Sequence, residues 1–100
     1  MLKVVERVLK FRDVRGWKKY HNPKDLAASI VIEASELLEI FQWVSEEESY
    51  DVARRNIERV REEVADILIY LIYLADVLQI DLEDAVLEKL KKNEEKYPVE

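Results

Sequence analysis

Residues 63–78 read EVADILIYLIYLADVL, and the part of this run after Asp66 predicts a helix that is buried on nearly every side. Apolar residues recur before and through it at helical spacing: Ile57, Val60, Val64, Ile67, Leu71, Leu74 and Leu78. We therefore expect one long helix from about Val52 to Leu78. Because a helix that is apolar all round needs neighbours on all sides, the rest of the chain should pack around it.

Two further helices are predicted upstream. Asn22-Pro23 supplies an N-cap and a proline for the first turn, and apolar spacing then continues from Leu26 to about Val44. Nearer the N-terminus, residues at helical spacing are Leu2, Val5, Val8, Leu9 and Arg12. This first helix should end at Gly16, since glycine is the preferred residue just beyond a helix.

The remaining segments complete a helical pattern. Residues 45–51 are polar and acidic, which predicts a connection or a single short turn. Asp81 can cap a last helix that ends at Tyr97-Pro98. No strand pattern is present. We predict an all-α fold, a compact bundle of about four helices that forms a single domain over residues 1–100.

Size and charge restrict the partners. A chain of 100 residues buries only about two-thirds of the surface that its unfolded form exposes, so association would cover leftover apolar surface. We expect a homodimer or homotetramer. The formal net charge is −6 and the basic residues form no dense stripe, which argues against a nucleic acid polymer as partner.

Cysteine content and hydropathy restrict the compartment. The chain has no cysteine, which excludes disulfides and thiolate zinc sites. The longest uncharged apolar run, residues 67–75, is far below the roughly 20 residues of a membrane span. The N-terminal residues lack the apolar core of a signal peptide. We expect a cytoplasmic protein with no membrane partner.

Two pairs of acidic residues interrupt the apolar helices at the same spacing, Glu33 with Glu36 and Glu63 with Asp66. Residues three apart share one face of a helix, so each pair places like charges side by side. Only Glu63 has a cationic residue, Arg59, within one helical turn. Burying unpaired carboxylates is costly unless a metal or a partner side chain compensates.

Carboxylates from two helices form a set of hard oxygen ligands, which favours Mg²⁺, with Mn²⁺ as an alternative. The alternative interpretation is that these acids face solvent or pair with Arg and Lys from another helix. The apolar neighbours of Glu33 and Asp66, residues 30–32 and 67–69, favour the metal site.

Aromatic and basic residues alternate just before the second helix: Trp17, Lys18, Lys19, Tyr20 and His21. Aromatic faces stack on nucleobases and cations attract phosphates, so this segment is a candidate for binding a nucleotide. As the only histidine, His21 rules out a histidine-rich metal centre. A lone histidine in a polar loop is more often ordinary surface, but the aromatic and basic neighbours of His21 favour a binding role.

Four other residues are candidates with alternatives. Trp43 belongs either to the core or to an interface. Tyr70 lies one turn beyond Asp66 and either satisfies a core acceptor or touches a ligand. The cations near the C-terminus complement the helix dipole, but Lys89 and Asn93, four apart on one face, are candidates for ligand contact.

Several of these segments occur in a familiar order: 11–12, 17–21, 33–36 with 37–43, 62–70, 89–93 and 97–98. The chain resembles the MazG-like nucleotide pyrophosphohydrolases, and most closely the dCTP pyrophosphatase branch. The match covers about nine-tenths of the chain. The paired E-x-x-E and E-x-x-D elements carry the resemblance, because both helices also match around them.

The resemblance implies an all-α fold that assembles into dimers or tetramers, with Mg²⁺ held by Glu33, Glu36, Glu63 and Asp66. It implies cleavage of a nucleoside triphosphate, such as dCTP, between the α and β phosphates. By the same likeness, the substrate-binding residues would be Trp17, Lys18, Lys19, Tyr20, His21, Trp43, Tyr70, Lys89 and Asn93. Lys96 and Val8 depart from the pattern, since many relatives have arginine and some have histidine there, so base preference stays open.

Such a site permits hydrolysis in which cations neutralise phosphate oxygens while water attacks in line with the pyrophosphate leaving group. One of Glu33 or Glu36 would orient or deprotonate that water. Two other hypotheses stay open: a non-catalytic helical dimerisation module, and a pyrophosphohydrolase that acts on another phosphorylated metabolite. The tryptophans favour a substrate that contains a base.

Overall fold

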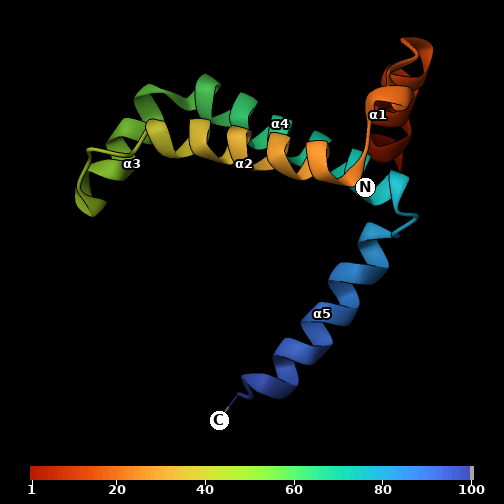
Figure 1. Cartoon of the computed structure of the whole chain (residues 1–100). Coiled ribbons are helices and arrows are strands. Elements are labelled where there is room, and N and C mark those ends of the chain that lie inside the picture. The colour runs from red at the N-terminus through yellow and green to blue at the C-terminus, as the bar shows by residue number, and fades with distance from the viewer. Residues whose placement is uncertain (100) are drawn as a thin grey trace.

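The computed structural model describes residues 1–99, which form helices joined by short connections (Figure 1). The elements are α1 (Leu2–Val14), the 3₁₀ helix η1 (Trp17–Tyr20), α2 (Pro23–Glu39), α3 (Glu46–Arg55), α4 (Ile57–Val77) and α5 (Leu82–Lys96). The all-α prediction is confirmed. The number of α-helices is five instead of about four, because one predicted connection is helical.

Local sequence signals fix most of the helix starts. The side chain of Asn22 accepts a hydrogen bond from the backbone N–H of Asp25 at the start of α2, and Asp81 caps α5 in the same way. Gly16 adopts a left-handed conformation with φ of 65°, which ends α1 and turns the chain into η1.

The prediction for residues 45–51 was wrong. Ser45 caps α3 by accepting a hydrogen bond from the backbone N–H of Glu48. Three glutamates in the first turn stabilise the helix further, because their negative charges interact favourably with the helix dipole. The single helix predicted from Val52 is divided at Asn56, whose backbone leaves the helical region with φ of −119° and ψ of 27°. The second helix also ends at Glu39 rather than near Val44, and turns follow it.

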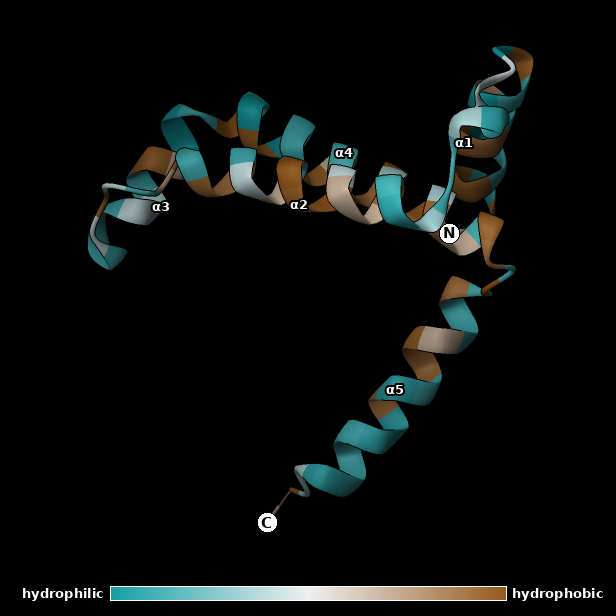
Figure 2. Cartoon of the chain, in the orientation of Figure 1, coloured by the Kyte–Doolittle hydropathy of each residue, from teal (hydrophilic) through white to brown (hydrophobic). Residues whose placement is uncertain are grey.

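Helices α2 and α4 lie side by side along most of their length and form the main body (Figure 1). Both helices contain many hydrophobic residues, which Figure 2 colours brown, and the buried residues include Leu26 of α2 and Ile72, Tyr73 and Ala75 of α4. Helix α1 crosses α4 near one end of this pair. The pair is therefore the frame on which side chains of α2 and α4 face each other.

A single chain does not close into a compact bundle by itself, and the prediction was a bundle completed by oligomerisation. Helix α5 projects away from the α2–α4 pair (Figure 1), and the radius of gyration is 16.4 Å, against about 13 Å expected for a compact domain of this length. Val64 and Leu71 of α4 remain exposed, as does Leu78 just after it, so the predicted burial of this helix on nearly every side is not reached within one chain. Among residues 1–99, no helix is both long and apolar enough to cross a bilayer.

Candidate active site

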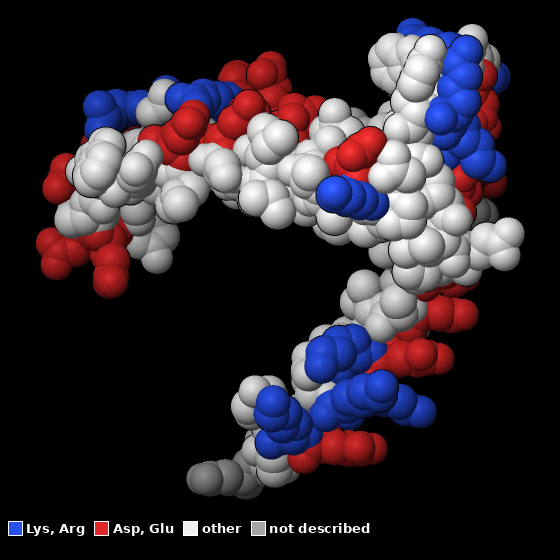
Figure 3. All heavy atoms as spheres, in the orientation of Figure 1, with Lys and Arg blue, Asp and Glu red and all other residues white. Residues whose placement is uncertain are grey.

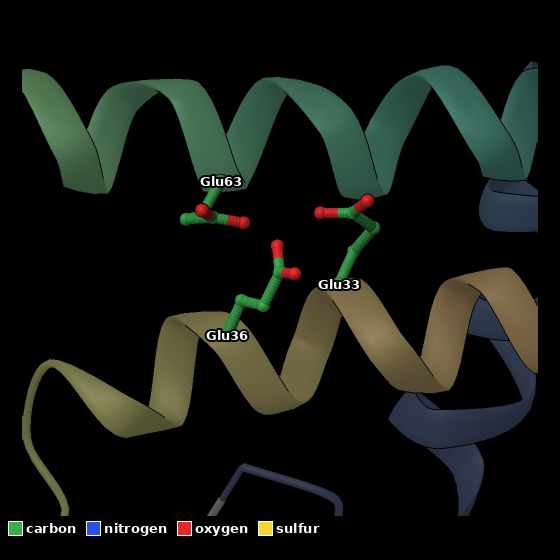
Figure 4. Close-up of side chains that lie close together, drawn as sticks. All are labelled: Glu33, Glu36 and Glu63. Carbon is green, nitrogen blue, oxygen red and sulfur yellow. The ribbon is translucent and has the colours of Figure 1, made fainter.

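Three carboxylates face one another between α2 and α4. Glu33 and Glu36 extend from α2, and Glu63 extends from α4 into the space between the helices (Figure 4). One oxygen from each side chain lies within 4.8 Å of the others. The three-residue spacing places both α2 glutamates on the face that packs against α4, so the cluster follows directly from the helix period.

This carboxylate cluster is electrostatically unbalanced. The Oε2 atoms of Glu33 and Glu63 are buried and have no hydrogen-bond partner. Burial, reinforced by neighbouring Glu36, raises the pKa of Glu33 to about 7. Burial and the charge of Glu36 also raise the pKa of Glu63. Both shifts show that a proton or another positive charge is favoured at this position.

No basic side chain neutralises the cluster. One ion pair joins α2 to α4 in the described part of the chain, between Glu39 and Arg59 at 3.5 Å, and both of its side chains are exposed. None of the ion pairs among residues 1–99 involves Glu33, Glu36 or Glu63. The alternative from the sequence, in which Arg or Lys from another helix pairs with these acids, therefore has no support within one chain.

The chemistry of the cluster fits a hard divalent cation. Mg²⁺ and Mn²⁺ bind carboxylate oxygens, and two oxygens here lack any partner. The fourth predicted acid, Asp66, is outside the three-residue cluster and exposed. Its charge nevertheless contributes to the raised pKa values of Glu33 and Glu63, so it belongs to the same electrostatic environment.

A groove of about 920 Å³ opens between α1 and α4, next to Asp66. We call it the α1–α4 groove, and it is lined by Lys3, Val4, Arg7, Val8, Lys10, Phe11, Val14, Trp17, His21, Asp66, Ile69, Tyr70 and Tyr73. The structure thus brings together Trp17, His21, Tyr70 and Asp66, four of the residues singled out from the sequence. Aromatic rings beside an acidic edge suit a flat ligand that also carries a metal-bound phosphate group.

The rings of the groove pack against one another. Trp17 meets Phe11 edge-on at 5.5 Å between ring centres. His21 lies 4.5 Å from Tyr73, and Tyr70 meets Tyr73 edge-on at 6.0 Å. Burial, with the positive charge of Arg12 nearby, lowers the pKa of His21 and so favours its neutral form. Its Nδ1 atom is buried and has no hydrogen-bond partner.

The other predicted residues lie outside this groove. Lys18 approaches Asp76 at 4.0 Å, while Lys19 lies over the exposed ring of Tyr20. Trp43 is 88% exposed in the turns after α2. Lys89 and Asn93 are on α5, which projects away from the α2–α4 pair (Figure 1). One chain therefore does not bring these residues to the carboxylates.

Among the aromatic residues of the groove wall, Phe11 and Tyr73 were not predicted as site residues from the sequence. Tyr73 follows Tyr70 by three residues and so shares its helix face, which was an available signal. Sequence reasoning also missed the role of Arg12, a charged residue at an otherwise apolar spacing. That anomaly marks a buried charge, and Arg12 is indeed buried.

Comparison of the sequence with known proteins identifies its family and several similar proteins. The sequence model of the MazG-like family matches residues 28–100. Proteins named dCTP pyrophosphatase 1 from Bos taurus and Homo sapiens are 43% and 39% identical over 91 and 90 residues, respectively. These matches cover 89% and 88% of this chain but 54% and 53% of the relatives, so the chain spans about half their length.

A solved structure matches over nearly the whole chain. The crystal structure of a pyrophosphatase from Archaeoglobus fulgidus DSM 4304 gives a TM-score of 0.94 at 52% sequence identity. The match covers 99% of this chain and 93% of that chain. The match therefore includes α5, so a similar arrangement of all the helices occurs in a crystal structure.

Proposed function

Because the chain belongs to the MazG-like family, we propose that it hydrolyses a nucleoside triphosphate to the monophosphate and pyrophosphate. The observation that carries this proposal is the cluster of Glu33, Glu36 and Glu63, with its two unpartnered oxygens. The names of the relatives, dCTP pyrophosphatase 1, support dCTP or a modified dCTP-like nucleotide as the substrate.

We assign the cation to the carboxylates of Glu33, Glu36 and Glu63, joined by Asp66 at the edge of the cluster. Mg²⁺ is the proposed ion, and Mn²⁺ has the same ligand preference. When bound, such an ion neutralises phosphate oxygens and stabilises the charge that develops on the pyrophosphate leaving group. The four side chains act as a fixed acidic frame, because the packed α2–α4 pair holds them.

The reaction adds water to the α-phosphorus and breaks its bond to the oxygen that bridges to the β-phosphorus. We assign Glu33 or Glu36 to orient the attacking water and accept its proton, since both lie on the α2 face turned towards α4 (Figure 4). A carboxylate with a pKa near neutrality is suited to accept a proton at physiological pH.

The base and sugar are assigned to the α1–α4 groove. Trp17, Tyr70 and His21 supply aromatic faces there, and stacking on such faces is tolerant of the base. Asp66 lies at the edge of the groove, so a nucleotide can place its base among the rings while its phosphates extend towards the carboxylates. Lys18, Lys19, Tyr20 and Trp43 are proposed to contact the nucleotide at its outer side.

Two proposed contacts require a second copy of the chain. Lys89 and Asn93 are on α5, which projects from the body and exposes Val86, Leu87 and Leu90. We propose a homodimer or homotetramer that covers these side chains and brings Lys89 and Asn93 towards the phosphates of a nucleotide. No nucleic acid polymer is assigned as a partner, since the formal net charge of −6 disfavours binding to a polyanion, and acidic side chains accompany the basic ones along α5 in Figure 3.

The first test is release of pyrophosphate from a panel of common and modified dNTPs and NTPs, with and without Mg²⁺. We expect Mg²⁺-dependent hydrolysis with a preference for cytosine nucleotides. Glu33→Gln and Asp66→Asn should each lower kcat at least about 100-fold, because a ligand charge is lost where charge must be stabilised.

The matched control is Glu62→Gln. Glu62 is adjacent to Glu63 but exposed on another face of α4, so its loss should leave kcat unchanged. Circular dichroism should show the same helix content in all variants. Full activity of Glu33→Gln with Mg²⁺ would remove the assignment of the site. Failure of the unmodified chain to hydrolyse any triphosphate would favour the non-catalytic helical module.

A further inference from the structure

Arg12 is the single charged side chain among residues 1–99 that is almost completely buried, with 2% of its surface exposed. Its Nε atom donates a hydrogen bond to Asp13 Oδ1 at 2.9 Å, and its Nη1 atom donates one to Asp76 Oδ2 at 2.7 Å. Two carboxylates thus compensate a buried guanidinium, whose burial without partners would be strongly unfavourable.

This arginine is also the only buried residue of α1. The other side chains of that helix are exposed or half-buried, including Val4, Val8 and Phe11 of the groove wall. Arg12 is therefore the most deeply buried point of contact between α1 and the rest of the molecule. Asp76 is near the end of α4, so the pair connects the two helices that form opposite walls of the α1–α4 groove.

The Arg12–Asp76 pair also lies close to other residues around the groove. Lys18 of η1 lies 4.0 Å from the Asp76 oxygen that Arg12 contacts. The guanidinium carbon of Arg12 is 5.9 Å from the centre of the Tyr73 ring, which in turn lies 4.5 Å from His21. Arg12 itself does not line the groove, but it contacts α4, which forms one wall of the groove.

We propose that Arg12, acting through Asp76, is a positioning residue that fixes the α1 wall of the groove and so determines the affinity for the nucleotide. The inference rests on the proposed function for the identity of the ligand. It concerns substrate binding alone, because the carboxylates of Glu33, Glu36 and Glu63 are held by α2 and α4 without α1. Substrate binding and metal binding should therefore separate in variants of this pair.

The test measures KM and kcat at saturating Mg²⁺ for Arg12→Met, Arg12→Lys and Asp76→Asn, together with the Mg²⁺ concentration that gives half-maximal rate. Arg12→Met should raise KM by about 10-fold to 100-fold, as expected when a binding wall is misplaced, with kcat and the Mg²⁺ midpoint unchanged. Arg12→Lys should restore part of the affinity. The double variant Arg12→Met with Asp76→Asn should be no worse than Arg12→Met, because the two residues act through one contact.

Arg54→Met is the matched control. Arg54 also pairs with an aspartate, Asp51 at 3.7 Å, but both side chains are largely exposed on α3, so KM should not change. An unchanged KM in Arg12→Met would overturn the proposal. So would a fall in kcat with a raised Mg²⁺ midpoint, because that pattern would place the effect at the metal site.

Hydrogen exchange tests the attachment of α1 without reference to activity. In Arg12→Met, amides of α1 should lose protection while those of α2 and α4 keep it, since α1 would open locally. Equal protection of α1 in the variant and the unmodified chain would overturn the proposal. If the unmodified chain hydrolyses no triphosphate, the proposed function fails, and exchange still decides whether Arg12 fixes the groove wall.

Discussion

Glu33 combines burial, an unpartnered oxygen and a like-charged neighbour, and each of these disfavours its ionised form. In a metal-free protein, the proton that Glu33 retains takes the place of a cation. The site is thus arranged for positive charge before any ligand arrives.

The raised pKa predicts a pH dependence of stability when metal is removed. The pKa of Glu33 is about 7 in the folded chain against 4.5 ordinarily, and that of Glu63 is shifted in the same direction. Between pH 4.5 and about pH 7 the folded state therefore holds more protons than the unfolded state, so the free energy of unfolding must fall as pH rises through this range. In EDTA, Tm should therefore be higher near pH 5 than near pH 8.

Mg²⁺ should reverse this loss, because an ion that binds only the folded state stabilises it. Glu33→Gln should flatten the pH dependence in EDTA and weaken the response to Mg²⁺, whereas Glu62→Gln should behave like the unmodified chain. Thermal unfolding followed by circular dichroism measures both effects. A Tm in EDTA that rises from pH 5 to pH 8 would contradict the account of the cluster.

The acids could be predicted from the sequence because their spacing obeys the helix period. Two pairs three residues apart must each share a face, and apolar neighbours show that the face is turned inward. Asp66 shows the limit of that reasoning. The helix period predicts which residues share a face, but it does not predict which carboxylates come close together across the two helices. The position of Trp43, exposed beyond the end of α2, likewise depends on where the helix stops.

Among the elements, α3 shows why boundaries were harder to predict than helix identity. Its first half is polar and acidic and it has no buried residue, so apolar spacing does not reveal where it begins. A cap and the acidic first turn start this helix instead. Ser45 accepts the backbone N–H of Glu48 at 3.2 Å and donates its hydroxyl to the Glu48 side chain at 2.9 Å.

Ser45→Ala should therefore destabilise the protein by about 1 kcal/mol, because the capping hydrogen bond is lost. Urea unfolding measures the change in the free energy of unfolding. Ser49→Ala is the control, since Ser49 lies inside α3, donates only to the backbone oxygen of Glu46, and alanine favours a helix interior. Equal losses in the two variants would show that the cap does not determine the start of α3. Hydrolysis should be unchanged in both, since α3 carries no proposed ligand.

At the scale of the whole molecule, α5 is the feature that a single chain does not explain. The sequence predicted this helix correctly from its cap at Asp81 and its end at Tyr97-Pro98, but those local signals say nothing about where the helix lies. A helix of this length is marginal in water unless its apolar face is covered. Val86, Leu87 and Leu90 are nevertheless 56%, 55% and 50% exposed. A second copy of the chain is the partner that the proposed function requires, since α5 also carries Lys89 and Asn93.

Leu90→Glu tests this assembly, because a charge on the apolar face of α5 should prevent its burial against another copy. The unmodified chain should have the mass of a dimer or tetramer by light scattering, and the variant should approach the 11.9 kDa of one chain. Lys92→Glu introduces the same residue on the opposite, polar side of α5 and should keep the assembly intact. Loss of hydrolysis should accompany dissociation in Leu90→Glu alone, because only dissociation removes Lys89 and Asn93 from the phosphates. A monomeric unmodified chain with full activity would show that α5 has no part in the site.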